Sequence, residues 1–369
     1  QANYCKVHTP SGWKRMGDIR VGDYVTAFDG SSVKVLGVFP QGKQQQYRVT
    51  FCDGRSTEAG GAHLWEVHNK YWRQKWKAGR SAAGTAKPRV MTTLELKAWI
   101  ERPAKKKQFA PTSVPLCAPV PKPFNKLIID PYALGLLIGD GSFTRNSVTF
   151  TSADHILCMW LESAVSGFGC EIVSQGNRQL DFRLRNVGEL RNALMVLGLH
   201  GHTSHTKFIP RDYLEGSVDQ RWELMRGLMD TDGTSSPALS YSTSSKRLAD
   251  NVCEVVRSLG GIAKIGTKVP TYTHRGEKRT GAISYKVNIR HPEPRKFFRL
   301  PRKLNALPET YQYADQLKLA VKSIEPTTVE ESTCILIDHP RHLYNTDDYI
   351  VTHNTVYAII DELAKALCG

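Results

Sequence analysis

Residues 132–142 read YALGLLIGDGS, and residues 224–234 repeat the pattern as LMRGLMDTDGT. In both copies an apolar run with helical spacing ends in Asp-Gly, so Asp140 and Asp232 close the two runs. An internal repeat shows that one supersecondary unit occurs twice, and missing it would misassign the whole fold. The repeat therefore predicts two similar units within this chain.

Similar elements follow each copy of the repeat. An amphipathic helix is expected over residues 154–167 after the first copy and over residues 246–260 after the second. Strands are expected after each copy as well, at residues 147–150, 180–184, 239–242 and 284–289. The order of elements predicts an α/β domain made of two αββαββα repeats.

Small residues recur where the two apolar helices would meet. They would let the helices approach closely, which would place Asp140 and Asp232 side by side. Adjacent carboxylates repel unless a divalent cation bridges them, and oxygen ligands suit Mg²⁺. The pair predicts an Mg²⁺ site for phosphodiester hydrolysis by water; the structural alternative is a buried helix closed by Asp-Gly. The small residues are Gly135, Gly139, Gly227 and Thr231.

The flanks of the repeat have β character. Residues 5–67 alternate short apolar runs with Gly and Asp turns, and β character returns from Lys318 onward. Six prolines between Pro103 and Pro123 exclude a helix or a central strand, so a domain boundary is expected there. The fold class is thus mixed: an all-β domain interrupted by an α/β insert. Residues 355–367 have the periodicity of an amphipathic helix.

Charge points to nucleic acid as a partner. The 369 residues include 50 Lys+Arg and 35 Asp+Glu, a net charge of +15 spread along the chain. Residues 70–89 interleave basic residues with Trp72 and Trp76, either as an arm that grips DNA or as a basic loop. No stretch has the length of a membrane span, so no membrane partner is expected. Eight Cys without a CxxC pair indicate a reduced, cytoplasmic protein.

The two Asp-Gly motifs resemble the LAGLIDADG signature of homing endonucleases, and the resemblance covers residues 125–308. It implies that Asp140 and Asp232 are the Mg²⁺ ligands, one for each strand cut. It also implies double-stranded DNA, the host gene without the insert, as the partner. Lys207, in the segment Lys-Phe-Ile-Pro, and Lys303 in the second repeat match a lysine that assists catalysis in intein-borne members. A phosphate contact or a solvated charge is the alternative for each lysine.

The flanking β segments resemble the horseshoe-like Hint domain of inteins, which splice themselves out of a host protein. Residues 9–25 match its opening, and residues 54–65 match its His-bearing block, with His63 as the histidine that activates the N-terminal scissile bond. The closing blocks are matched by His342, His353 and Asn354. The expected domains are residues 1–124 and 311–354 for the splicing domain, 125–310 for the endonuclease, and 355–369 for the C-extein.

Two departures narrow the type of intein. Residue 1 is Gln1, which cannot form the usual ester or thioester, and the usual Thr is replaced by Gly60. The class 3 inteins instead carry a Trp-Cys-Thr set, which Trp65, Cys334 and Thr352 match. In that class the internal Cys attacks the N-terminal scissile bond directly. The rival is Cys5 as a class 1-like nucleophile, with the first four residues as flanking extein.

The resemblance implies an order of steps without ATP or any cofactor. Cys334 takes the acyl chain from Gln1, Thr355 receives it, and Asn354 cyclises last, with His353 and His342 moving protons. Residues 355–358 look like the end of a phosphate-binding loop, so the host is expected to be a P-loop ATPase such as a helicase or terminase. A monomer is expected. Two alternatives stay open: an intein with an inactive endonuclease domain, and a free-standing endonuclease.

Overall fold

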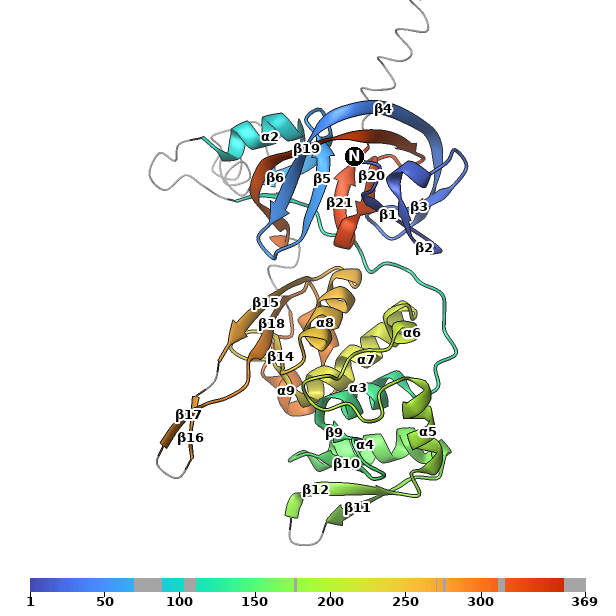
Figure 1. Cartoon of the computed structure of the whole chain (residues 1–369), viewed down its shortest axis with the longest axis vertical. Helices are drawn as coiled ribbons and strands as arrows, with labels where there is room; N and C mark the ends of the chain where they lie inside the picture. The colour runs from blue at the N-terminus through green and yellow to red at the C-terminus, as the bar shows by residue number, and fades with distance from the viewer. Residues whose placement is uncertain are drawn as a thin grey trace, which may run out of the picture. The chain divides into compact units, whose positions relative to one another are not determined.

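The computed structural model describes residues 1–69, 88–102, 111–175, 178–269, 271–274, 277–310 and 316–354. The chain divides into two compact units (Figure 1). Unit 1 comprises Gln1–Pro121 and Gln316–Gly369, and unit 2 is Lys122–Asp315. Unit 2 is therefore an insertion in the sequence of unit 1. The basic segment with Trp72 and Trp76 and the tail helix expected at residues 355–367 lie outside the described residues. Within the described parts, no helix is long and apolar enough to cross a membrane.

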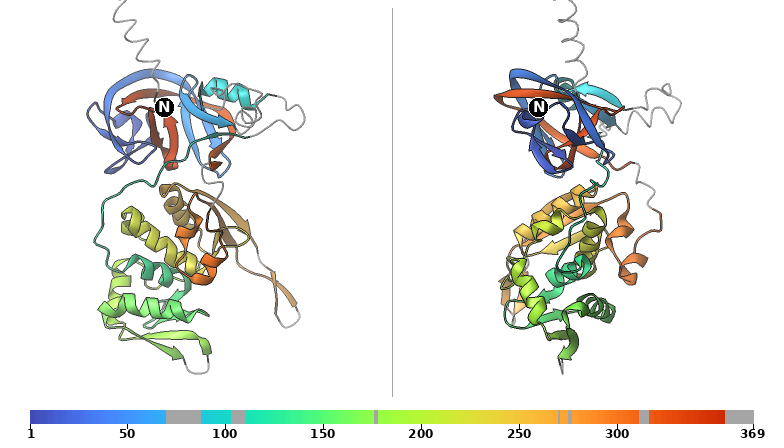
Figure 2. Two further views of the ribbon diagram at one scale, coloured as in Figure 1. Left: turned by 180° about the vertical axis from the view of Figure 1, so that it is seen from behind. Right: turned by 90° about the vertical axis from the view of Figure 1, so that its right-hand side faces the viewer.

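Two long strands form the frame of unit 1. β4 (Ser32–Phe51) and β19 (Leu319–Ile337) pair antiparallel along most of their length. The register shifts at several points along the pair, and such irregularities bend strands. The two strands run side by side as a curved pair in all views (Figure 2). Because β4 comes before the insert and β19 after it, this pairing joins the two halves of unit 1.

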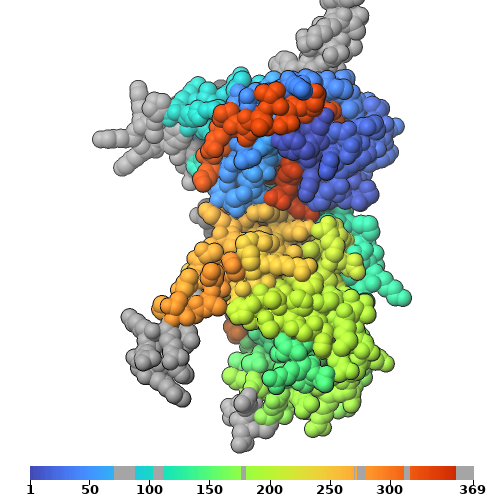
Figure 3. Space-filling view, in the orientation of Figure 1, coloured from blue at the N-terminus to red at the C-terminus, as the bar shows by residue number. Residues whose placement is uncertain are grey.

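The other strands of unit 1 complete two antiparallel sheets. The larger sheet has the order β3 (Tyr24–Thr26), β4, β19, β8 (Thr112–Val114), β6 (Leu64–Asn69) and β7 (Arg89–Thr92), with β5 (Ser56–Gly60) on β4. The smaller sheet has the order β2 (Gly12–Arg15), β1 (Lys6–Thr9), β20 (Leu343–Thr346) and β21 (Ile350–His353). In the space-filling view, blue N-terminal and orange-red C-terminal segments lie against each other in this unit (Figure 3). The prediction of a β domain is confirmed.

Two elements of unit 1 differ from the expectation. The proline-rich stretch was expected to exclude a central strand, yet β8 lies between β19 and β6. The expectation was wrong because Pro111 and Pro115 bracket three residues whose own N–H groups remain free to pair. The helix α2 (Thr93–Ile100) was not expected in a β domain. Its signal is the capping box formed by Thr92 and Glu95.

Unit 2 consists of two repeats with the same order of elements, αββαββα. The first has α3 (Pro131–Asp140), β9 (Gly141–Ser142), β10 (Val148–Thr151), α4 (His155–Val165), β11 (Glu171–Gln175), β12 (Arg178–Arg185) and α5 (Gly188–Val196). The second has α7 (Val218–Thr231), β13 (Gly233–Thr234), β14 (Ser240–Thr243), α8 (Lys246–Ser258), β15 (Ile262–Lys268), β18 (Ser284–Arg290) and α9 (Pro301–Asn305). The short helix α6 (Arg211–Leu214) connects them, and the hairpin β16 (Thr271–His274) and β17 (Glu277–Thr280) is inserted in the second.

The sheet orders of the two repeats correspond. The first sheet runs β11-β12-β10-β9 and the second runs β15-β18-β14-β13. Corresponding positions therefore carry corresponding elements, and the predicted repeat is confirmed. One continuous core of buried apolar side chains extends through both repeats.

Helices α3 and α7 touch through their backbones. A Cβ added at Gly135 would lie 2.5 Å from the Leu224 carbonyl oxygen, and one added at Gly227 would lie 2.2 Å from that of Tyr132. Real Cβ atoms do not approach oxygen so closely, so both positions require glycine. The predicted close packing of the two repeat helices is therefore confirmed, and it brings their C-terminal ends together.

Candidate functional site

The first residues of the chain pair with β19. The Gln1 amine donates to the Thr333 carbonyl at 3.0 Å, and the Thr333 amide donates to the Gln1 carbonyl at 2.9 Å. Ala2 then bridges to Ser332 in the same antiparallel register. Continuing this register by one residue places Cys334 opposite the position that precedes Gln1.

Several predicted residues gather around the Gln1 amine. Gln1 is buried, and this burial lowers the pKa of its amine, while the nearby Cys334 and Cys5 thiols oppose the shift. Burial also lowers the pKa of His63 well below its ordinary value, and the Gln1 amine and His353 lower it further. The Cys334 thiol and the His63 ring thus both lie near the Gln1 amine, and burial favours the neutral form of His63.

His63 is fixed from two sides and open on a third. Its Nε2 lies 2.5 Å from Thr352 Oγ1, and its ring makes an edge contact with Trp65 at 5.2 Å between centroids. Trp65 Nε1 donates to Thr93 Oγ1 at 3.0 Å, and that hydroxyl donates to the His63 carbonyl at 3.2 Å. Among the described atoms, His63 Nδ1 has no hydrogen-bond partner although it is buried. Trp65 and Thr352 therefore orient a ring whose remaining nitrogen is available.

The last described residues form a second cluster in the same unit. His353 Nδ1 contacts the Asn354 carbonyl oxygen, and burial lowers the pKa of His353. The Asn354 amide donates to the His342 carbonyl at 2.8 Å. With its side-chain amide oriented to satisfy both neighbours, Asn354 Nδ2 also donates to the His342 carbonyl at 3.3 Å and Oδ1 accepts from Ile337 N–H at 3.2 Å. The predicted residues His342, His353 and Asn354 are thus brought together, and Thr355 lies outside the described residues.

The rival nucleophile Cys5 lies in a different environment. Its thiol is buried and donates to the Glu58 carbonyl at 3.3 Å. Burial raises the pKa of Cys5 to about 11, and the Asp347 carboxylate contributes to the rise. A thiolate is the nucleophilic form of cysteine, so these contacts disfavour attack by Cys5.

Two residues that hold Gln1 were not found from the sequence. Tyr344 Oη donates to the Gln1 side-chain oxygen at 3.1 Å, and Gln1 Nε2 donates to Thr57 Oγ1 at 3.5 Å. Tyr344 is buried on β20 and Thr57 on β5. Thr57 lies within the His-bearing block of residues 54–65, but the block gives no sign of a contact with Gln1. The pairing of distant strands in three dimensions reveals both contacts.

Unit 2 brings the two predicted carboxylates to one place. Burial, and then the nearby Asp232 carboxylate, raise the pKa of Asp140 to about 7, against the opposing ammonium groups of Lys207 and Lys303. The Asp232 side chain reaches solvent, yet the surrounding protein atoms raise its pKa too. Asp140 ends α3 and Asp232 follows the last residue of α7, so the paired helices deliver both groups.

The two predicted lysines occupy equivalent positions under the helix ends. Lys207 Nζ donates to the carbonyls of Leu137, Ile138, Gly139 and Gly141 at 2.6–3.3 Å. Lys303 Nζ donates to the carbonyls of Met229, Asp230, Thr231 and Gly233 at 2.7–3.0 Å. Both lysines are buried, and burial lowers the pKa of each to about 8. Neither is a solvated charge: each caps a helix terminus that carries negative partial charge.

The residues present suit a divalent cation of the Mg²⁺ type. Mg²⁺ is commonly held by one or two carboxylates and keeps water and phosphate oxygens as its other ligands. Asp140 and Asp232 supply two carboxylates that repel each other, as the raised pKa of Asp140 shows. Among the residues that the structure describes, no group of three or more His, Cys, Asp or Glu side chains is arranged so that it could hold a metal ion. Two carboxylates would leave the other ligand positions of Mg²⁺ to water or to further oxygen atoms.

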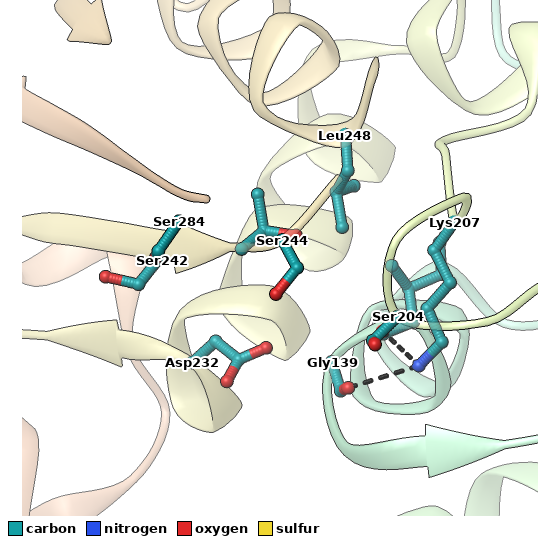
Figure 4. Close-up of a pocket in the computed structure, with 10 residues that line it drawn as sticks. Gly139, Ser204, Lys207, Asp232, Ser242, Ser244, Leu248 and Ser284 are labelled. Atoms are coloured by element: carbon teal, nitrogen blue, oxygen red, sulfur yellow. Dashed lines mark hydrogen bonds between the residues drawn. The ribbon is translucent and has the colours of Figure 1, made fainter. Parts of the chain in front are cut away.

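A polar pocket of about 260 Å³ adjoins Asp232 and Lys207 (Figure 4). Its other polar lining comes from hydroxyl side chains on strand β14 and the residue after it, on strand β18, and on the segment before Lys207. These are Ser204, Ser242, Thr243, Ser244 and Ser284. The view shows the Asp232 carboxylate and the Lys207 ammonium entering from opposite sides, with Lys207 bonded to α3. Hydroxyl donors beside a cation suit an anionic, phosphate-bearing ligand.

Comparison with known proteins gives one curated relative and several solved structures. No family model matches the chain. The chain is 29% identical over 365 residues to the replicative DNA helicase DnaB of Mycobacterium intracellulare, covering 95% of this chain and 58% of the helicase. The chain thus spans little more than half the length of that relative.

The solved structures are of two kinds. The crystal structure of the MchDnaB-1 intein is similar at 11% identity and a TM-score of 0.30, covering 96% of this chain and 98% of that one. The structure of I-DmoI in complex with DNA and Ca is similar at 14% identity and a TM-score of 0.30, covering 46% of this chain and 85% of that one. I-DmoI is a homing endonuclease. The matched solved structures are thus inteins and homing endonucleases, the two kinds of protein that the sequence resembles.

Proposed function

We propose that this chain excises itself from a host protein and joins the flanking segments. The observation that carries the proposal is the backbone pairing of Gln1 with Thr333. This is a hydrogen-bonded pair, so the next pair along the antiparallel ladder is a close one, with Cα atoms about 4.5 Å apart and side chains on the same face. A residue joined to the Gln1 nitrogen would thus present its carbonyl carbon to the Cys334 thiol.

The first step is acyl transfer to Cys334. The sulfur–carbon bond forms, the carbon–nitrogen bond to Gln1 breaks, and the Gln1 nitrogen takes up a proton. His63 is neutral because of its burial, so it can accept the thiol proton and return it to the departing nitrogen. Its unpaired Nδ1 and its proximity to the Gln1 amine support this role. Trp65 and Thr352 act by orienting the His63 ring.

The later steps move the acyl chain and release the insert. The Thr355 hydroxyl attacks the thioester, which frees the Cys334 thiol and forms an ester. Asn354 Nδ2 then attacks its own carbonyl carbon, the bond to Thr355 breaks, and a succinimide remains. His353 Nδ1 lies against the carbonyl oxygen that gains charge in this step, and His342 holds the Asn354 amide groups. The freed Thr355 nitrogen finally takes the acyl group from its own oxygen. These are exchanges of acyl bonds, so they need no cofactor.

Mass spectrometry of a precursor with added flanking segments tests this proposal. We expect joined flanks and a free chain of residues 1–354. Cys334→Ala should abolish both products, while Cys5→Ala should retain them because the Cys5 thiol is protonated and bonded to a carbonyl. Splicing that persists in Cys334→Ala and is lost in Cys5→Ala would assign the reaction to Cys5 and overturn the proposal.

We propose a second activity for unit 2, the cutting of double-stranded DNA. The carrying observation is the convergence of Asp140 and Asp232 at the ends of two backbone-packed helices. Bound Mg²⁺ would supply the charge that stabilises the leaving oxygen of a phosphodiester. Asp140 and Asp232 would hold it, one carboxylate for each strand. Lys207 and Lys303 favour the ionised form of both carboxylates and fix the helix ends that carry them.

A plasmid that carries the host gene without the insert tests this second activity. The wild-type chain should convert the plasmid to linear DNA only when Mg²⁺ is present, and the double variant Asp140→Asn with Asp232→Asn should leave it intact. If wild type binds the plasmid without cutting it, unit 2 is an inactive DNA-binding insert. Cutting by the double variant would instead place the reaction elsewhere in the chain.

The similarity to DnaB supports a replicative helicase, which is a P-loop ATPase, as the host. In this proposal residues 1–124 and 311–354 splice, residues 125–310 cut DNA, and residues from Thr355 onward belong to the helicase. The chain acts as a monomer in the cytoplasm. A free-standing endonuclease would not need the arrangement of His353 and Asn354, so that alternative is disfavoured.

A further inference from the structure

Glu66 is a buried carboxylate on β6, directly after Trp65. Its Oε1 accepts a hydrogen bond from Arg341 Nη2 at 2.6 Å and lies 3.0 Å from His68 Nε2. Burial raises the pKa of Glu66, but the contacts with His68 and Arg341 outweigh burial and lower the pKa, so the carboxylate is ionised. Breaking a buried ion pair leaves a charge uncompensated, so this pair holds its two segments together.

Arg341 lies in the turn between β19 and β20, directly before His342. Its guanidinium group also lies over the Phe28 ring, 4.2 Å from the centroid. His342 has φ +55°, a left-handed conformation that is uncommon for residues other than glycine and persists only where the surrounding structure holds it. The contacts of Arg341 supply part of this support, and the His339 carbonyl, which accepts from the His342 amide at 2.9 Å, supplies another part.

The same turn holds Asn354. The His342 carbonyl accepts from the Asn354 backbone amide at 2.8 Å and from its Nδ2 at 3.3 Å, so it fixes both the backbone and the side-chain nitrogen. β6 also packs against β21, the strand that ends at His353. Burial lowers the pKa of His353, and the Glu66 carboxylate is one of the groups that oppose this shift. Glu66 therefore lies near the residues of the last splicing step as well as beside Trp65.

We propose that the Glu66–Arg341 ion pair is a positioning device for the last step of splicing: it holds the turn before β20 in the shape that places Asn354 for cyclisation. This rests on the proposed splicing. Arg341 acts through the His342 carbonyl and takes no part in the bond changes. β6 also carries Trp65, which orients the histidine of the first step. The pair thus connects the strand that serves the first step with the turn that serves the last one, and its loss should slow the last step while sparing the first.

A time course with Arg341→Gln in the precursor with added flanking segments tests the proposal. After denaturation, hydroxylamine releases an N-terminal flank that is held as a thioester or an ester, and mass spectrometry measures this flank and the free chain of residues 1–354. The flank should become releasable at the wild-type rate. The free chain should appear roughly 10- to 100-fold more slowly, because a misplacement of about 1 Å can cost about 100-fold in rate.

Two further variants show whether the two side chains act as a pair. Glu66→Gln removes the charge from the other side and should give the same pattern. Combined with Arg341→Gln, it should slow the last step no further than the slower single variant does, because both changes break one interaction. Arg341→Lys keeps the charge but loses the planar fork, so it should recover part of the rate.

Arg48→Gln is the matched control. Arg48 Nη2 lies 2.8 Å from Glu58 Oε1, and the two side chains are 55% and 11% exposed, against 43% and 9% for the proposed pair. The control pair joins β4 to β5 and not to the turn before β20. Arg48→Gln should melt at about the same temperature as Arg341→Gln but complete both steps at the wild-type rate.

Three results would overturn the inference. They are wild-type rates for both steps in Arg341→Gln, equal slowing of both steps in that variant, and the same slowing of the last step in Arg48→Gln. The second and third would show a general structural role. If wild type yields neither a releasable flank nor joined flanks, the proposed splicing itself is refuted before any variant is compared.

Discussion

Asp140 lies where an ionised carboxylate costs folding free energy. Its pKa is raised to about 7 by burial and by Asp232, whereas an aspartate in the unfolded chain titrates near 3.9. The folded protein therefore binds more protons than the unfolded chain between these pH values, and the stability gained from the proton is lost as the pH rises through about 7. At alkaline pH and without metal, the carboxylate pair is thus a source of instability.

Asp140→Asn should stabilise the metal-free protein in a pH-dependent way. The amide stays neutral, so the free energy of unfolding should exceed that of wild type by on the order of 2–4 kcal/mol at pH 8 and by almost nothing at pH 4. Urea unfolding at the two pH values measures this difference. As a control, Asp250→Asn removes an exposed carboxylate paired with Lys246 on α8, and should change stability by less than about 1 kcal/mol. A loss of stability in Asp140→Asn at pH 8 would contradict the electrostatic account.

The Asp140 carboxylate lowers the folding stability of the metal-free protein but is the group that would bind Mg²⁺. Added Mg²⁺ should stabilise wild type but not Asp140→Asn, because only the carboxylate binds the cation strongly. The structural alternative, a helix closed by Asp-Gly, does not require this response. The glycine after Asp140 also differs from an ordinary cap: Gly141 has φ −80°, and glycine is needed because a Cβ would lie 2.4 Å from the Leu137 carbonyl oxygen.

At the scale of elements, the contact between α3 and α7 decides where the carboxylates lie. Gly227→Ala should destabilise unit 2 by about 1–3 kcal/mol or more, because the added methyl group meets the Tyr132 carbonyl oxygen at 2.2 Å and backbone must shift. Separation of the helices should also move the Asp140 and Asp232 carboxylates apart, which would weaken their repulsion and their joint binding of Mg²⁺. Thermal melting measures the first consequence, and the Mg²⁺ concentration needed for half-maximal cutting measures the second.

Gly188→Ala controls for the substitution itself. Gly188 is the first residue of α5, and a Cβ there would have no neighbour within 4 Å. Alanine should leave stability unchanged or raise it by roughly 0.4–1 kcal/mol, through the smaller entropy of the unfolded chain. Equal losses in the two variants would show that the backbone contact at Gly227 does not set the cost.

The elements differ in how far sequence reasoning could reach them. The helices α3 and α7 and their glycines were predictable because the repeat shows the same spacing twice. The strand β8 was not, because its three residues pair only after β19 returns from the far side of the insert. Trp65, His63 and Thr352 were found through a family resemblance, but their mutual contacts join strands far apart in sequence.

At the scale of the molecule, the two units have separate cores. The buried apolar residues of unit 2 form one cluster, and those of unit 1 form clusters of their own. Both halves of unit 1 are joined by the β4–β19 ladder and not through unit 2. The sequence indicated the interruption through the change of pattern, since β character stops before the repeat and returns after it. Unit 1 therefore has the contacts it needs to fold without the insert.

Replacing Lys122–Asp315 by a flexible linker should leave splicing intact. Val114 at the end of β8 lies opposite Leu319 at the start of β19. The chain leaves unit 1 at Pro121 and returns at Gln316, so both ends lie within a few residues of neighbouring strands of one sheet. The seven residues from Val114 to Pro121 span at most about 25 Å when fully extended. A Gly/Ser linker of about 12 residues has a typical end-to-end distance near 20 Å, so it can join the two ends. The shortened precursor should give joined flanks, with Cys334→Ala in the same background as the inactive control. A shortened protein that unfolds cooperatively but yields no joined flanks would show that unit 2 contributes directly to splicing.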